Sequence, residues 1–307
     1  MLGVVGFRRL AVVTATFAYL QIALGGVVRV SGSGLGCPDW PLCHGRPYPP
    51  ADLHAIIEYS HRAVGSVTGI LIVATVVLAW AIYRNRRPAV AWLATGSLIG
   101  VVGEGVLGGV VVVKELSPWL VVVHLGLAMM ILGFLVATAV MAGPPVAGVP
   151  DRSFRRLAAL AAGATYVLLL TGSTVVASHP DQSCHAWPLC GGGLTTNFDG
   201  ATAFAMLHRG AVLVIGLLIV YVLVTAIRRW GMRSGIGLSA IATLAIFGAQ
   251  IAVGAGSALT DGPFFNGLHV ALATLVWAGV LTCAVLTLPR TDRSVELSHL
   301  SVEKSSA

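Results

Sequence analysis

The chain has 307 residues, of which 56% are hydrophobic and only 10% are charged, and its mean hydropathy is +0.88. Soluble domains carry about 25% charged residues, so this composition excludes an ordinary soluble domain and indicates an integral membrane protein. The net charge of +7 does not indicate a nucleic-acid partner, because the basic residues are spread over separate segments rather than one face.

Eight apolar segments are each close to the roughly 20 residues that a helix needs to cross a bilayer. The first is longer than the apolar region of a signal peptide and lacks a clear cleavage site, so we expect a retained helix. The sequence therefore predicts an all-α integral membrane protein with eight transmembrane helices. In chain order the segments cover 10–30, 54–82, 89–113, 119–141, 157–177, 203–227, 235–258 and 265–287.

The positions of the basic residues predict the orientation of these helices. With the N-terminus inside, fourteen of the nineteen Lys and Arg residues fall on inner segments, which is a strong positive-inside signal. We therefore expect a multi-pass protein of the cell membrane with both termini cytoplasmic. Two cysteine-bounded loops, "CPDWPLC" (37–43) and "CHAWPLC" (184–190), then lie on the outer face, where disulfides persist.

An internal repeat organises the chain. "FRRLAVVTATFAYL" from Phe7 parallels "FRRLAALAAGATYV" from Phe154, and the same offset of 147 residues relates the two cysteine loops. We expect a tandem duplication, with four-helix halves at 1–141 and 152–288, a linker at 142–151 and a polar cytoplasmic tail at 289–307. Each half has an even number of helices, so the two four-helix bundles should be related by a pseudo-twofold axis along the membrane normal.

Four histidines fall near the outer ends of the even-numbered spans, and the repeat pairs them across the halves. Ionisable residues at membrane depth are costly and rare without a role. A single such histidine would more often be a packing residue, but four at one level favour ligation of haem iron by pairs of imidazoles. A zinc site would need further ligands. The four are His61, His124, His208 and His269.

Small residues lie one turn further in on some of these spans. They would leave room for a flat group beside the imidazoles, or they could simply allow close helix packing. They are Gly65, Gly69, Ala128 and Ala273.

Arg62 and Arg209 directly follow a histidine in both halves. They are candidates for binding haem propionates, although a snorkelling arginine is an equal alternative. Arg29 is a weaker candidate for a propionate, because Val176 takes its place in the second half.

The halves differ in their acidic residues. Glu58 lies three residues before His61, whereas Ala205 occupies the corresponding place in the second half. A carboxylate beside a haem could transfer protons, which suggests chemistry in the first half and electron transfer in the second. Alternatively, Glu58 is a solvated residue at a helix end. For Glu104, opposite Gln250, we expect a polar contact between helices.

The cysteine loops allow three interpretations. We favour a structural disulfide, at least in the second loop, which would fix the outer cap by constraining the chain. A redox-active disulfide that exchanges electrons or thiols with a partner is the second interpretation. A metal bound transiently with His44 or His185 is the third.

Taken together, "GCPDWPLCHG", "EYSHR", the second "WPLC" and paired histidines over eight spans resemble the heme A synthase family, over about Phe7 to Leu288. The resemblance implies an oxidoreductase that converts the C8 methyl of haem O to a formyl group. Two hydroxylations and loss of water would give haem A for cytochrome oxidase. By the same resemblance His208 and His269 ligate a resident haem b, His61 and His124 bracket the substrate haem, and Glu58 is catalytic. The implied disulfides are Cys37–Cys43 and Cys184–Cys190.

The implied partners are haem O, haem O synthase, cytochrome oxidase assembly factors and a quinone or ferredoxin-like electron partner. No nucleic acid is expected, and a homo-oligomer is compatible with the sequence. The main rival is a di-haem b-type membrane cytochrome that passes electrons from quinol without substrate chemistry. A quinone-linked thiol oxidoreductase would leave the histidines idle, and a transporter would need helices broken at the midplane.

Overall fold

The structure is a computed structural model that describes residues 3–144, 151–178, 184, 186–190 and 200–290. These residues form long α-helices joined by loops, and each helix is long and apolar enough to cross a membrane. The predicted all-α membrane protein with eight spans is therefore confirmed. The helices are α1 (Val4–Val30), α2 (Leu53–Tyr83), α3 (Pro88–Val113), α4 (Pro118–Met141), α5 (Arg152–Ala177), α6 (Gly200–Trp230), α7 (Gly235–Thr260) and α8 (Pro263–Leu286).

The observed helix bounds differ most from the predicted ones at the starts of α1 and α5. Both helices begin several residues before the apolar segment and include the repeated Phe-Arg-Arg sequence. Hydropathy alone misses these polar turns, because arginine is a good helix former although it is not apolar.

Local sequence explains where several helices begin. Asp52 caps α2 by accepting a hydrogen bond from the Ala55 N–H, and Asp151 caps α5 in the same way at Phe154 N–H. Proline occupies the first position of α3, α4 and α8, where a missing N–H costs nothing.

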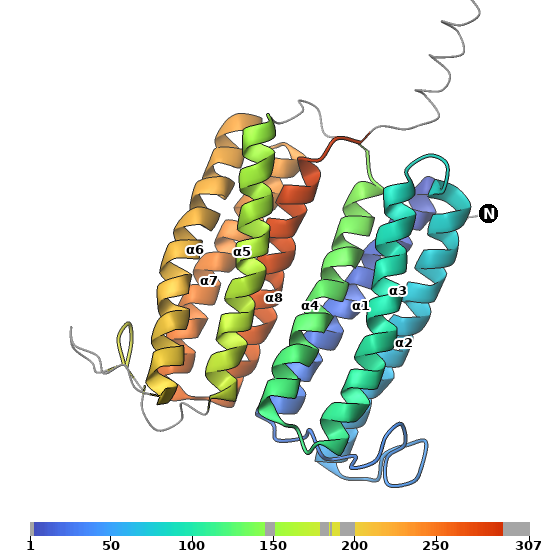
Figure 1. Ribbon diagram of the computed structural model, residues 1–307, viewed down its shortest axis with the longest axis vertical. Helices are drawn as coiled ribbons and strands as arrows, with labels where there is room; N and C mark the ends of the chain where they lie inside the picture. The colour runs from blue at the N-terminus through green and yellow to red at the C-terminus, as the bar shows by residue number, and fades with distance from the viewer. Residues whose placement is uncertain (1–2, 145–150, 179–183, 185, 191–199, 291–307) are drawn as a thin grey trace, which may run out of the picture.

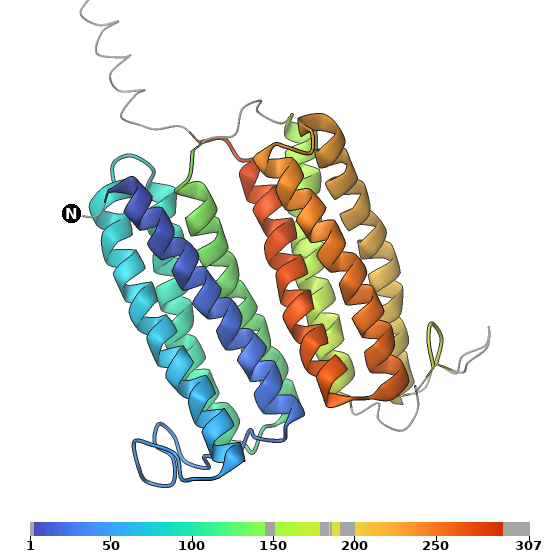
Figure 2. The ribbon, with the colours of Figure 1, turned by 180° about the vertical axis from the view of Figure 1, so that it is seen from behind.

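The helices form two bundles that lie side by side, α1–α4 and α5–α8 (Figures 1 and 2). Within the first bundle each helix packs against its neighbours in the order α1, α2, α3, α4 and back to α1, and the second repeats this order. The helices that carry the candidate histidines, α2 with α4 and α6 with α8, are therefore diagonal partners. This arrangement leaves the bundle interior between them.

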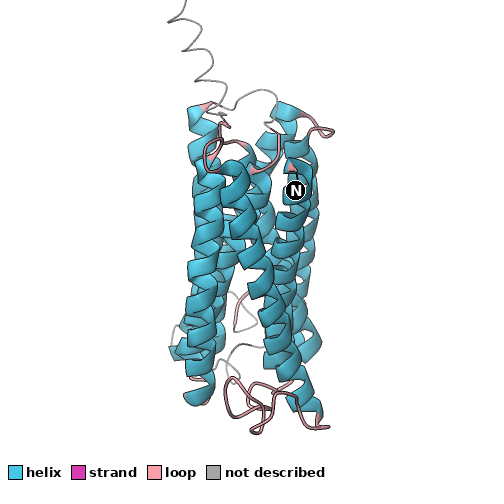
Figure 3. Ribbon diagram, turned by 90° about the vertical axis from the view of Figure 1, so that its right-hand side faces the viewer, coloured by secondary structure: helices cyan, strands magenta, loops and turns pink. Residues whose placement is uncertain are grey.

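The connections divide the molecule into two ends. We call one end of the molecule the linker end, because the chain passes from α4 to α5 there (Figure 1). Helix α1 begins at this end, and α4 and α8 end at it. The long connection from α1 to α2, blue in Figure 1, lies at the other end, the cysteine-loop end. Figure 3 shows large pink loops at this end of the helices. The predicted linker 142–151 and tail 289–307 lie mostly outside the described residues.

The two bundles meet through α1, α4, α5 and α8. The Tyr166 hydroxyl of α5 donates to the Gly126 carbonyl of α4 at 3.0 Å, and Trp277 of α8 packs on Gly133 of α4. Contacts of α1 with α8 mirror those of α5 with α4, which is the pattern that a twofold relation of the halves would produce. The pseudo-twofold axis itself stays a prediction.

Candidate functional site

The four predicted histidines lie at matching heights near the cysteine-loop end. His61 and His208 are eight residues from the first residue of α2 and α6, and His124 and His269 are six residues from the first residue of α4 and α8. At 1.5 Å per residue these positions are about 12 Å and about 9 Å along their helices. Within each half the two imidazoles are close enough for their charges to interact. The structure thus brings the histidines together in two pairs.

Each imidazole lies against a glycine of a neighbouring helix, so we call these glycines the histidine seats. A Cβ at any seat would come within 2.8–3.3 Å of the Cε1 atom of the ring, which is closer than ordinary van der Waals contact. Only glycine therefore leaves the ring in its observed place. The four pairs are Gly25 with His61, Gly108 with His124, Gly172 with His208, and Gly254 with His269.

A polar side chain also approaches each ring from the helix that carries its seat. The distances are 3.2 Å from Gln21 Nε2 to His61 Nε2, 3.1 Å from Glu104 Oε1 to His124 Nδ1, 2.9 Å from Thr171 Oγ1 to His208 Nδ1, and 3.4 Å from Gln250 Nε2 to His269 Nε2. Glu104, for which a polar helix contact was expected, thus faces a candidate ligand. Partners of this kind fix the orientation of an iron-ligating imidazole.

Three of the rings carry a buried Nδ1 atom without a hydrogen-bond partner, namely those of His61, His124 and His269. For His124 the nearby Glu104 oxygen is at ion-pair distance but not aligned for a hydrogen bond. Buried polar atoms are normally satisfied, so unsatisfied ring nitrogens on paired, glycine-seated imidazoles fit axial ligation of a haem. Among the described residues no cluster of three His, Cys, Asp or Glu side chains could hold a bare metal ion.

Glu58 is 4% exposed, so the alternative interpretation as a solvated helix-end residue is wrong. Its Oε2 accepts a hydrogen bond from the Cys37 N–H at 2.8 Å, and its Oε1 pairs with Arg62 Nη2 at 2.5 Å. The carboxylate is therefore held in place between α2 and the first cysteine loop, one turn from His61. A carboxylate has further lone pairs, so these two contacts leave it with free acceptor positions.

Arg62 holds the same loop through its terminal nitrogens. Nη1 donates to the Asp39 and Leu42 carbonyls, each at 2.6 Å, and Nη2 donates to the Cys37 carbonyl at 2.7 Å as well as to Glu58. Three of the four terminal N–H groups thus bind loop carbonyls, and the fourth binds Glu58. The propionate role of Arg62 stays a prediction, without a contact that supports it.

Arg209 also binds its cysteine loop in the second half, donating to the Ala186 and Pro188 carbonyls at 2.9 Å. Its propionate role also stays a prediction. Arg29 lies exposed in the last turn of α1, and its propionate role likewise stays a prediction.

Both cysteine pairs form disulfides, Cys37–Cys43 and Cys184–Cys190. The first disulfide is fully buried. Asp39 orders the loop around it by accepting the His44 and Gly45 N–H groups at 2.6 and 2.7 Å. These hydrogen bonds, that from Gly45 first, hold the Asp39 pKa below its usual value. His44 Nε2 lies 2.9 Å from the Gly36 carbonyl oxygen. His185, the other histidine considered as a metal ligand, lies outside the described residues.

Sequence reasoning missed the histidine seats and the loop-holding role of the arginines. It placed small residues on the histidine helices themselves, where Gly65 makes room for Gln21 and Gly69 faces open space. The internal repeat carried the missing signal: Gly25 and Gly172 are 147 residues apart, and Gly108 and Gly254 are 146 apart.

These features define a duplicated eight-helix membrane protein with two pairs of intramembrane imidazoles, one pair beside a buried acid. The sequence matches the COX15-CtaA family, described as cytochrome oxidase assembly protein, over residues 8–56 and 51–281. Among curated relatives, heme A synthase of Symbiobacterium thermophilum is 30% identical over 95% of this chain and 98% of its own length. Heme A synthase of Exiguobacterium sibiricum is 30% identical over 90% and 92%, and that of Shouchella clausii 27% over 83% and 87%. The chain belongs to the COX15-CtaA family.

Proposed function

We propose that this protein is a heme A synthase that oxidises the C8 methyl of haem O to a formyl group. The observation that carries the proposal is an asymmetry between the two imidazole pairs: Glu58 stands beside His61, and Ala205 stands at the same place beside His208. A purely electron-transferring di-haem protein has no need for a buried acid at one site. The names of the relatives agree with the proposal.

The second half would hold a resident haem b through His208 and His269, and the first half would hold the substrate haem O through His61 and His124. Glycine seats and the unsatisfied ring nitrogens support both assignments. When bound, haem b supplies a one-electron relay toward a quinone or ferredoxin-like partner.

The chemistry takes place on the substrate methyl carbon. One hydroxylation gives an alcohol, a second gives a geminal diol, and the diol loses water to leave the aldehyde. Each hydroxylation would take its oxygen from water and release two protons and two electrons, and the electrons would pass to the quinone or ferredoxin-like partner. Glu58 would take a proton or position water at that carbon, because its carboxylate is buried and fixed by the Cys37 N–H and Arg62. The loop and its disulfide would keep bulk water away from this carboxylate.

Pigment analysis of the purified protein tests the proposal directly. The chain is produced in a host that makes haem O but no haem A, and its haems are extracted and identified by mass. We expect haem b together with haem A, haem O or the hydroxylated intermediate. Haem b alone, with no haem A in the membranes, would instead assign the protein to the di-haem cytochromes.

A further inference from the structure

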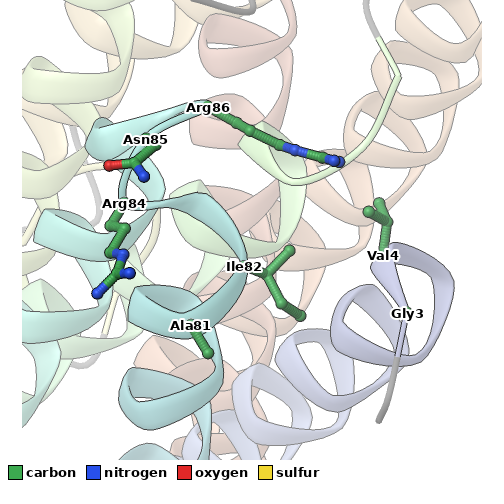
Figure 4. A pocket seen from close by; sticks show the side chains of 7 residues that line it. All are labelled: Gly3, Val4, Ala81, Ile82, Arg84, Asn85 and Arg86. Atoms are coloured by element: carbon green, nitrogen blue, oxygen red, sulfur yellow. The ribbon is translucent and has the colours of Figure 1, made fainter. Parts of the chain in front are cut away.

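A group of arginines at the linker end has no part in the proposed chemistry. Two adjoining cavities of about 400 and 270 Å³ open there between α1 and the turn from α2 to α3, and they share Val4 and Arg86 as lining residues. Arg86 extends from the turn toward the start of α1 (Figure 4). We call the two cavities together the arginine pocket. Its basic lining residues are Arg8, Arg84, Arg86 and Arg87.

The pocket is joined to the end of α4 and to the chain after α8. Arg87 Nη1 donates to the carbonyls of Met141 and Gly143, at 3.2 and 2.9 Å, and Arg290 Nη1 donates to the Pro144 carbonyl. Burial, and then the positive charges of Arg87 and Arg8, lower the pKa of Arg290. These cations therefore lie close enough to repel one another.

The repulsion is not balanced by acids of the described chain. Among the described residues, the carboxylate that lies near the linker end is that of Asp151, and it already pairs with Arg229 at 2.8 Å. The Nε atoms of Arg87 and Arg290 and the Nη2 atom of Arg290 are buried without a hydrogen-bond partner. Buried cationic donors of this kind need an anion with several acceptor oxygens.

The pocket also has an apolar rim. Val4 and Val5, which line it, are 42% and 68% exposed on the outside of α1, and Ile82 lies beside Arg84. A ligand that matches both features has a negative head and an apolar tail. We propose that the arginine pocket binds the phosphate of an anionic phospholipid, with the acyl chains along the outer faces of α1 and α2. Basic pockets between transmembrane helices bind such headgroups in other membrane proteins.

The second half provides a natural comparison, because the repeat replaces two of the arginines. Gly231 and Ser234 stand where the first half has Arg84 and Arg87, whereas Arg155 and Arg233 correspond to Arg8 and Arg86. Ser234 instead caps α7 by accepting the Gly237 N–H at 2.9 Å. We therefore expect one lipid site, in the first half alone.

The experiment titrates the purified full chain with short-chain phosphatidylglycerol, short-chain phosphatidylcholine or inorganic phosphate at constant ionic strength, following the thermal unfolding midpoint. Phosphatidylglycerol should raise the midpoint to a plateau, whereas phosphatidylcholine and phosphate should not. In Arg84→Gln/Arg86→Gln, whose altered side chains are exposed, the dissociation constant should rise about tenfold or more. Arg228→Gln/Arg233→Gln removes two exposed charges from the other half, and it should change the dissociation constant by less than about threefold.

Three results would overturn the proposal. Equal weakening in both double variants would mean attraction by net charge alone, and a response to inorganic phosphate equal to that of phosphatidylglycerol would mean a site for free phosphate. The third concerns the acids that follow Arg290 in the sequence, Asp292, Glu296 and Glu303. Lipid binding that emerges only after all three are changed to Asn or Gln would mean that the chain's own tail fills the pocket.

Discussion

The two halves of the molecule share their helices, histidine seats and disulfides, yet they differ in how the cysteine loop is held. In the first half Glu58 and Asp39 accept four hydrogen bonds from the loop backbone and from Arg62. In the second half Ala205 and Ala186 stand at these places, although Arg209 still contacts the loop carbonyls. The two halves thus share paired imidazoles on glycine seats, and among the described residues the acids that hold a cysteine loop belong to the first half.

This comparison indicates a division of labour. A pair of imidazoles needs only seats and orienting partners to hold an iron, and both halves have them. Oxidation of a carbon also needs a group that accepts protons, and in the proposed function only the first half has one beside a ligand. The two halves should therefore be alike as haem sites and unlike as reaction sites.

The largest expected effect comes from removing one ligand of each pair. His61→Ala should abolish haem binding in the first half, and His208→Ala should abolish it in the second, because one imidazole leaves an axial position empty. The haem-to-protein ratio and the absorption spectrum of purified variants check this. His54→Ala, on the same helix as His61 but bonded to Ser33, should keep both haems. Loss of both haems in either histidine variant would show that the sites are not independent.

Each half has an arginine that binds its cysteine loop, Arg62 in the first and Arg209 in the second. Replacing Arg62 should destabilise the protein more than replacing Arg209. Arg62→Ala leaves the buried Glu58 carboxylate unpaired, which costs about 3–5 kcal/mol. Arg209→Ala loses hydrogen bonds to carbonyls and pairs with no described carboxylate, so we expect a cost of about 2 kcal/mol. Unfolding of the purified variants measures both, and Arg62→Ala/Glu58→Ala should recover part of the loss. Equal losses for the two arginines would contradict the proposed difference between the loops.

Glu58→Gln tests the reaction while sparing the loop. Glutamine keeps an acceptor oxygen for the Cys37 N–H but cannot take a proton, so haem A formation should fall about 100-fold. Haem content should stay unchanged. The yield of haem A per protein is the measurement, and Glu115→Gln, an exposed acid at the same end, is the control. A normal yield from Glu58→Gln would remove this residue from the mechanism.

The histidine seats allow a graded test of the likeness between halves. Gly254→Ala places a Cβ 2.8 Å from His269 Cε1, and Gly108→Ala places one 3.3 Å from His124 Cε1. Gly254→Ala, which makes the closer contact, should weaken haem retention in the second half by about tenfold. Gly108→Ala should weaken haem retention in the first half by less. Haem loss to apomyoglobin measures both. Gly248→Ala, on the same helix as Gly254 with open space around it, should retain haem normally.

The smallest effect concerns pH. The folded-state pKa of Asp39 is lowered, so its charge stabilises the first loop above the unfolded-state pKa of about 4, and this contribution is lost as pH falls through the folded value. The protection of the His44 and Gly45 backbone N–H groups against hydrogen exchange should therefore fall in acid, after correction for the intrinsic exchange rate at each pH. Asp39→Asn should abolish that step, and an unchanged profile in this variant would contradict the assignment. Ala186 cannot titrate at the corresponding place in the second half.

The sequence by itself predicted the eight helices, the duplication and the four histidines. Apolar segments of membrane-spanning length define the helices, and an offset of 147 residues exposes the repeat without any structure. The helix starts at Val4 and Arg152 were missed, because the arginine pairs near the starts of α1 and α5 interrupt the hydropathy signal.

Only the tertiary structure determined which side chains of different helices and loops contact one another. Periodicity places Glu58 near His61 on α2, but the fold turned its carboxylate to a loop 21 residues earlier in the chain, where the Cys37 N–H holds it. The same holds for the glycines that seat the imidazoles, which lie on neighbouring helices and acquire a role only when the bundles close. Sequence spacing fixes neighbours along one helix, whereas contacts between helices depend on how all eight pack together.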